Sequence, residues 1–323
     1  MIAALLATLH IMTHNGAIYD VVEDIPAGSC IIGGTETLVY EASTFNTCQE
    51  IRLKPGCYRV EMMGGLGGLY PDCLNATQQM ITNPLSGMFT LNTETTVYAF
   101  RGGDGMPGTV NKSGSYYGSF GGGASGADSI VVVGDRVLRA RGGVGGTCVR
   151  IIGYSPSFNM GLPTFGANGI GGGADFGDGA WSRPVCASLY EYATERYVNG
   201  FYGGGGGGAP SGTGGVTFAM TTGCPTDAVV GVGASGTLSG GGDGGNVTNA
   251  LYRPNDATTQ SATGGRGGAN VTFQCGGQTI TVYGGGGGGG TINGSVRVVR
   301  NGGDGGSGST GTSNTSYLRI YKM

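Results

Sequence analysis

Apolar residues recur at every second position in short runs along much of the chain. Tyr98 and Phe100 form one such pair, and Ile280 and Val282 form another. A period of two is typical of β-strands, because successive side chains of a strand point to opposite faces. Together with the longer strand-like run DSIVVVGDRVLRA at 128–140, this pattern predicts a mainly β fold.

Helical periodicity is scarce. The best candidate is SLYEYATERYV at 188–198, where Leu189, Tyr192 and Tyr197 lie along one loose helical face. We therefore expect little α-helix, with 188–198 as the candidate helix.

Strand-like runs repeatedly lead into runs of glycine. Examples are YRVEMMGGLGG, TVYAFRGGDG and ITVYGGGGGGG. About ten such segments occur at irregular spacings of roughly 10 to 40 residues, which argues against a tandem repeat of fixed period. One local pattern is therefore used many times within one architecture.

The glycine runs allow two interpretations, a slack tether or a packed element. Glycine can form the extended left-handed polyproline-II helix, with three residues per turn and a rise of ~3.1 Å, and it keeps its N–H. Several such helices can hydrogen-bond laterally because no Cβ separates them. A tether would have Ser-, Gln- or charge-rich flanks. Apolar and aromatic flanking residues instead predict a bundle of polyglycine-II helices: Phe100, Val144, Phe201, Tyr202 and Tyr283.

The composition supports a folded chain and narrows its partners. Glycine and proline make up about a quarter of the 323 residues, a content that borders on low complexity. However, only 11% of residues are charged, and the chain has 16 Tyr and 10 Phe. Disordered chains are usually rich in charge and poor in such residues. The chain has no Gly-X-Y repeat, which excludes collagen. Its net charge of −3, without a basic cluster, argues against nucleic acid as a partner.

The N-terminal stretch MIAALLATLHIM at 1–12 is apolar but too short to span a bilayer. It is either a signal peptide or an assembly segment, and no other stretch predicts a membrane span. We divide the chain into an apolar leader or assembly segment at 1–28 and a single glycine-rich domain at 29–323, with Cys-containing loops inserted in it.

The cysteines favour disulfides over a zinc site. No two of them form C-x-x-C, and the only histidines are His10 and His14. An even number of cysteines in a chain of low charge indicates an oxidising compartment, although free thiols in a reducing cytosol are the alternative. The sequence does not choose the pairing among the eight candidates Cys30, Cys48, Cys57, Cys73, Cys148, Cys186, Cys224 and Cys275.

Six N-x-S/T triplets are candidate glycosylation sites, which matter only if the host glycosylates the protein. They begin at Asn75, Asn111, Asn246, Asn270, Asn293 and Asn314.

Candidate chemistry is sparse, and we expect neither an enzyme nor a cofactor or metal. Nucleophilic catalysis needs a base in a pocket, and both histidines lie in the first 14 residues. Two carboxylates near the single tryptophan could flank a sugar, although a solvated turn or a buried anchor tryptophan is the simpler interpretation. The candidate ligand-binding residues are Asp175, Asp178, Trp181, Arg183, Tyr190, Tyr192 and Tyr197.

The tetrapeptide GGDG occurs three times, with Asp104, Asp243 and Asp304 at equivalent places. The nonapeptide spacing of calcium-binding glycine–aspartate repeats is missing. We expect each carboxylate to accept a hydrogen bond from a nearby backbone N–H at the edge of the glycine bundle.

The run LKPGCYRVEMMGGLGG resembles the opening of glycine-rich domains in phage tail fibres and bacterial surface proteins. The run GSFGGGASGADSIVVVGDRVLRARGGVGG also resembles the glycine-rich extracellular region of the anaplastic lymphoma kinase and leukocyte tyrosine kinase receptors. The resemblance covers about 50–150 well. It implies a tumour-necrosis-factor-like, jelly-roll-like β-sandwich whose strands feed a polyglycine-II bundle.

These observations suggest a non-enzymatic recognition protein, either an adhesin or a receptor-binding tip. Loops at 147–200 and 250–262 would bind a cell-surface glycan or protein. A structural subunit of an extracellular filament, coat or virion shell is the first alternative, with copies of itself as partners and SYLRIYKM as an edge strand. A receptor-like ectodomain that binds a ligand is the second alternative. In each case the protein would be secreted or lie on a cell or virion surface.

Overall fold

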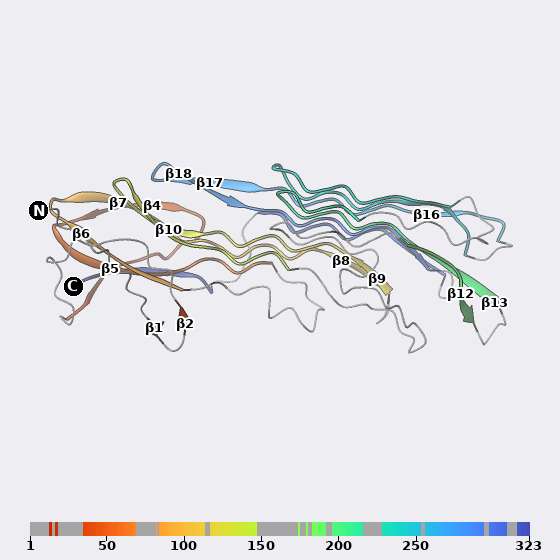
Figure 1. Cartoon of the computed structure of the whole chain (residues 1–323), viewed down its shortest axis with the longest axis horizontal. Helices are drawn as coiled ribbons and strands as arrows, with labels where there is room; N and C mark the ends of the chain where they lie inside the picture. Colours follow the sequence, from red (N-terminus) through yellow and green to blue (C-terminus); the bar gives the residue numbers. More distant parts are fainter. Residues whose placement is uncertain are drawn as a thin grey trace, which may run out of the picture.

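The computed structural model describes residues 13–14, 17–18, 35–68, 82, 84–113, 117–146, 174, 179, 183–191, 196–215, 228–252, 256–293, 297–308 and 315–323. Among these residues the fold is mainly β, with several antiparallel sheets and no helix. The molecule is elongated: β5, β6 and β7 lie at one end, β12 and β13 lie at the other, and long traces run side by side between them (Figure 1). Apart from two short strands, the predicted leader at 1–28 lies outside the described residues.

Two four-stranded sheets share one hydrophobic core. The C-terminal sheet has the strand order β3 (Thr37–Glu41), β21 (Tyr317–Lys322), β5 (Gly56–Met63) and β6 (Leu85–Leu91). The central sheet has the order β11 (Arg136–Ala140), β10 (Ser129–Val133), β7 (Thr95–Phe100) and β4 (Cys48–Leu53). Alternate residues of both sheets, such as Val60 and Ile320 from one and Val97 and Val131 from the other, are fully buried in a common cluster. The alternation at Tyr98 and Phe100 and the strand-like run at 128–140 therefore predicted β7, β10 and β11 correctly.

The other face of the central sheet packs against a hairpin made of β17 (Val271–Cys275) and β18 (Gln278–Val282). Ile280 and Val282 of the hairpin are buried with Phe100 of the sheet. The hairpin turns at Gly276 and Gly277, whose φ angles are both positive, as a tight two-residue turn requires. The sequence alternation at 280–282 thus corresponds to a strand with one buried face.

The distal sheet lies at the opposite end of the molecule from β21 (Figure 1). Its order is β12 (Arg183–Glu191), β13 (Arg196–Tyr202), β19 (Thr291–Asn293) and β20 (Val298–Arg300). A three-stranded sheet of β14 (Val229–Val230), β15 (Val247–Ala250) and β16 (Gln260–Ala262) shares a core with it, in which Phe201, Val247 and Ile292 are fully buried. Two more pairs are β1 (Thr13–His14) with β2 (Ala17–Ile18) and β8 (Val110–Ser113) with β9 (Tyr117–Phe120).

The helix expected at 188–198 does not form in the described residues 188–191 and 196–198, which are strands, so that prediction was wrong. Residues 188–191 end β12, residues 196–198 begin β13, and Tyr190 lies directly opposite Tyr197. Tyrosine and valine favour strands, and the apolar face of the expected helix was loose and short. Pairing of β12 with β13 therefore outweighs a weak helical pattern.

The C-terminal run SYLRIYKM is not an edge strand, which corrects a second expectation. Strand β21 pairs with β3 on one side and with β5 on the other. Its side chains Leu318 and Ile320 are fully buried. The edge strands of this sheet are β3 and β6 instead, and in β3 the side chains of Leu38 and Val39 are 48% and 41% exposed.

Between the sheets, glycine-containing segments lie against one another and form what we call the glycine array. Hydrogen bonds join them backbone to backbone at every third residue. The N–H groups of Gly203, Gly206 and Ala209 donate to the carbonyls of Gly290, Gly287 and Gly284, respectively. The segments are 64–68, 101–109, 121–127, 141–146, 203–208, 212–215, 231–236, 240–246, 263–268, 283–290 and 301–308.

Segments of the array bond to neighbours in more than one direction. Within 203–208, the N–H groups of Gly204 and Gly207 donate to 231–236, whereas those of Gly203 and Gly206 donate to 283–290. A β-strand, by contrast, bonds only within the plane of its sheet. A slack tether would make no such bonds, so the tether interpretation is excluded for these segments.

The array leaves no room for side chains at most glycine positions. A Cβ added to Gly287 would lie 2.2 Å from the carbonyl oxygen of Gly265. In some segments the other residues recur at every third position, as Asn301, Asp304 and Ser307 do. This period of three is confined to single segments, so it does not appear as a Gly-X-Y repeat along the whole chain.

Candidate functional site

The three aspartates of the GGDG tetrapeptides accept backbone hydrogen bonds, as predicted. Asp104 Oδ1 accepts from the N–H of Leu66 at 2.8 Å, Asp243 Oδ1 from Gly267 at 2.7 Å and Asp304 Oδ1 from Arg266 at 2.8 Å. Among the described residues no group of three or more His, Cys, Asp or Glu side chains could hold a metal ion. Asp243 and Asp304 are exposed and complete the array at its surface, whereas Asp104 is buried and also accepts a hydrogen bond from the Thr315 hydroxyl.

Segment 263–268 shows how a surface segment satisfies all of its N–H groups. Gly265 and Gly268 donate inward to carbonyls of 283–290. The other four donate to side-chain oxygens of the two flanking segments: Thr263 to Asn301, Gly264 to Asn246, Arg266 to Asp304 and Gly267 to Asp243. Side chains thus replace the carbonyls that further segments would provide in a larger array.

The candidate ligand-binding residues fall into two groups. Asp175, Asp178, Trp181 and Tyr192 lie outside the described residues. The rest, Arg183, Tyr190 and Tyr197, belong to β12 and β13 of the distal sheet. Tyr190 and Tyr197 are register partners, so the structure brings them together from the two strands.

One row of the distal sheet joins the candidate Arg183 to three residues that the sequence did not indicate as a site, Tyr202, Thr291 and Arg300. Arg183 pairs with Tyr202, Tyr202 with Thr291, and Thr291 with Arg300. Thr291 is only 2% exposed, and its Oγ1 and the Nε of Arg300 are buried without a hydrogen-bond partner. No local motif marks these residues, because strand pairing alone brings them into one row. The positions where strands meet glycine runs, next to Gly203, Gly290 and Asn301, were the available signal.

The outer face of the C-terminal sheet carries charged and aromatic side chains that are already paired with one another. The Arg59 side chain donates to Glu36 and Glu61 and lies 4.6 Å from the ring centre of Tyr321. The hydrogen bond from Arg59 lowers the pKa of the Glu36 carboxyl, although burial opposes it. The same bond raises the pKa of Arg59. This face stabilises the sheet and offers no unpaired charge at these residues.

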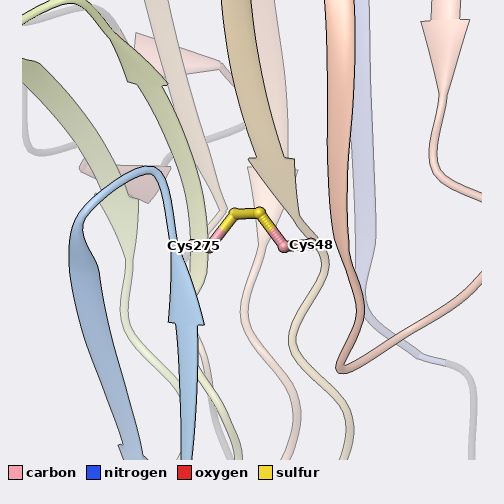
Figure 2. Close-up of a disulfide and its surroundings, with 2 residues drawn as sticks. All are labelled: Cys48 and Cys275. Carbon is pink, nitrogen blue, oxygen red and sulfur yellow. A yellow bond between two sulfur atoms is a disulfide. The ribbon is translucent and has the colours of Figure 1, made fainter.

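Two disulfides involve described cysteines. Cys48 of β4 is bonded to Cys275 of β17, with Cα atoms 5.2 Å apart, and the bond holds the hairpin against the central sheet (Figure 2). Cys57 is also disulfide-bonded. Disulfides are typical of an oxidising compartment. The bonding of Cys30, Cys73, Cys148, Cys186 and Cys224 is not described by the structure.

Two of the six glycosylation candidates use their side chains in the array. Asn270 Nδ2 donates to the carbonyl of Leu238, and its Oδ1 accepts from the N–H of Gly284. Asn246 Oδ1 accepts from Gly264. Asn111 and Asn293 lie in β8 and β19, and Asn75 and Asn314 lie outside the described residues. A glycan on Asn270 would be attached to Nδ2, the same atom that donates to the carbonyl of Leu238, and would leave it a single N–H.

No helix in the described part of the chain is long and apolar enough to cross a membrane. Compared with the models of known protein families and with curated proteins, the chain matches none of them.

Proposed function

We propose that the protein is a non-enzymatic surface-recognition protein, an adhesin or receptor-binding tip, that presents its distal end on a rigid scaffold. The observation that carries this proposal is the separation of β12 and β13 from the C-terminal sheet by the length of the glycine array (Figure 1). Tyrosines are enriched in binding interfaces, and Tyr190 and Tyr197 meet at that far end. The ligand would be a cell-surface glycan or protein, outside the cell.

The scaffold, in this proposal, is a polyglycine-II lattice attached to a β-sandwich. A helix with three residues per turn aims every third N–H at the same neighbour, which matches the bonds of Gly203, Gly206 and Ala209. The absence of space for a Cβ at Gly287 supports the same packing. The shared core of the two four-stranded sheets supports the sandwich. Recognition residues are commonly placed on loops held by such a rigid support.

A cell-binding assay tests the proposal with the full-length, oxidised protein. We expect Trp181→Ala with Tyr192→Ala, and separately Tyr190→Ala with Tyr197→Ala, to weaken binding about tenfold or more. The matched control is Tyr317→Ala, a tyrosine of β21 at the opposite end. If both double variants bind as the wild type does, the assignment of these residues to the binding site is wrong. If the wild type binds neither cells nor a glycan array, the recognition function is wrong.

A second candidate is a structural subunit of a filament, coat or shell, and the exposed edge strand β3 favours it. Leu38 and Val39 are 48% and 41% exposed, and an unpaired edge can add a strand from another copy. Negative-stain electron microscopy of the purified protein distinguishes the two. Regular filaments or sheets would support the subunit, whereas discrete particles would support the recognition protein.

A further inference from the structure

Thr291 and Arg300 lie opposite each other at the place where the distal sheet joins the glycine array. Thr291 directly follows segment 283–290, and Arg300 directly precedes segment 301–308. Side chains of directly opposed residues in an antiparallel pair share a face, with Cβ atoms about 4.5–5.5 Å apart. The two side chains are therefore close neighbours on one face.

Both side chains carry a buried polar atom that lacks a partner. The two atoms are Thr291 Oγ1 and Arg300 Nε. Among the described residues, no other buried side-chain nitrogen or oxygen atom lacks a hydrogen-bond partner. Buried polar groups are nearly always hydrogen-bonded, so each exception needs an explanation. Two exceptions at neighbouring positions indicate a place for a shared acceptor.

The charge of Arg300 also lacks a counterion among the described residues. Arg297, in the same hairpin, lies 4.0 Å from a carboxylate oxygen of Asp256, whereas no described carboxylate pairs with Arg300. Arg300 is partly exposed although its Nε is buried, and β20 is the last strand of its sheet, so a ligand that reaches Nε must come from this side of the sheet. An anion is the partner that a guanidinium with a free Nε binds best, because the planar fork donates two parallel hydrogen bonds.

We propose that Thr291 and Arg300 bind the oxyanion group, carboxylate or sulfate, of an acidic glycan. This inference rests on the proposed recognition function and names its ligand class. Arg300 would donate from Nε, and the Thr291 hydroxyl would donate to the same group. Arg183 and Tyr202 occupy the same row of register partners, from β12 and β13.

The array holds this pair of residues in place before any ligand binds. The N–H of Gly288 donates to the carbonyl of Gly303 at 2.8 Å, and that of Gly285 donates to Gly306 at 3.0 Å. These bonds tie the segment before Thr291 to the segment after Arg300. A site whose parts are fixed in this way loses little entropy when it binds.

Isothermal titration of the oxidised full-length protein tests the site, with glucuronate, glucose 6-sulfate and glucose as probes. We expect an acidic sugar to bind and glucose not to bind, and the preferred acid distinguishes a carboxylate site from a sulfate site. Thr291→Val, which replaces the hydroxyl with a methyl group of similar size, should weaken binding about tenfold, and Arg300→Gln should weaken it further. Arg300→Lys keeps the positive charge but lacks the planar fork, and it replaces Thr291→Val as the test variant if Thr291→Val does not fold. The matched control Arg297→Gln should stay within about twofold of the wild type.

Three results would overturn this assignment. They are no binding of either acidic sugar, an equal loss in Arg297→Gln and Arg300→Gln, and a crystal structure with saturating ligand in which only water lies between Thr291 Oγ1 and Arg300 Nε. Cell binding without acidic-sugar binding would reject this site and keep the proposed function. Acidic-sugar binding without cell binding would keep this site and reject the proposed function.

Discussion

The carboxylate oxygen Oδ1 of Asp243 accepts a hydrogen bond of 2.7 Å from the backbone N–H of Gly267. The two residues belong to adjacent segments of the glycine array. On the other side of segment 263–268, Asp304 Oδ1 accepts a hydrogen bond from the backbone N–H of Arg266. The array is small, so many of its segments lie at its surface and have N–H groups without a neighbouring carbonyl. Side-chain oxygens at every third position supply the missing acceptors.

Replacing Asp243 with alanine should lower the free energy of unfolding by about 1–2 kcal/mol, because the N–H of Gly267 loses its acceptor. Asp243→Asn keeps an acceptor oxygen at the same place and should cost less than half as much. Urea unfolding followed by circular dichroism measures both. Equal effects of the two substitutions would show that the charge matters and the hydrogen bond does not.

Glycine 287 should tolerate no side chain. Gly287→Ala places a Cβ 2.2 Å from the carbonyl oxygen of Gly265. The backbone of segment 283–290 or of segment 263–268 must then move. We expect a loss of about 3 kcal/mol or more in the free energy of unfolding, or failure to fold. Gly134→Asn is the control, since Gly134 has open space around it and asparagine accepts its φ of 61°. A stable Gly287→Ala protein would contradict the packing of the array.

Removing the Cys48–Cys275 disulfide should loosen the hairpin of β17 and β18 more than the rest of the molecule. The bond links residues 227 apart in sequence. We expect Cys48→Ala with Cys275→Ala to lower the free energy of unfolding by about 2–5 kcal/mol, since long loops lose the most entropy on closure. Hydrogen exchange of the amides in 271–282 should accelerate, whereas that of β5 and β21 should change less. Uniform acceleration in both regions would reject a local role for the bond.

The ion pair between Glu36 and Arg59 should make stability depend on pH in the acid range. The pKa of Glu36 is lowered from its ordinary value of 4.5, so the folded state favours the carboxylate. Its contribution is complete above the unfolded pKa and is lost as the pH falls below about 4.5 through the folded pKa. Glu36→Gln should be less stable than the wild type at pH 7 by less than about 1 kcal/mol, because the pair is partly exposed. Denaturant unfolding should show this difference vanishing towards pH 3, and a constant difference would reject the pair.

The local parts of this fold could be read from the chain because their cause is local. Burial of one face of β18 requires alternation at Ile280 and Val282, and a carboxylate next to a glycine run needs a backbone donor nearby, as at Asp304. The helix expected at 188–198 failed because the period there was weak and sheet pairing decided the outcome. The prediction that SYLRIYKM is an edge strand failed for a related reason, since the sequence of that run does not determine how many strands pair with it.

Local sequence patterns were enough to predict that the chain is mainly β, that its glycine runs pack and that the GGDG aspartates bind backbone N–H groups. Tertiary structure alone decided that Cys48 pairs with Cys275, that β21 lies inside its sheet and that Thr291 meets Arg300 beside Tyr202. The physical reason is the range of the interactions. Alternation and hydrogen-bonding capacity belong to single residues and their neighbours, whereas strand register and segment packing depend on residues that are distant in the chain and become neighbours only in the folded protein.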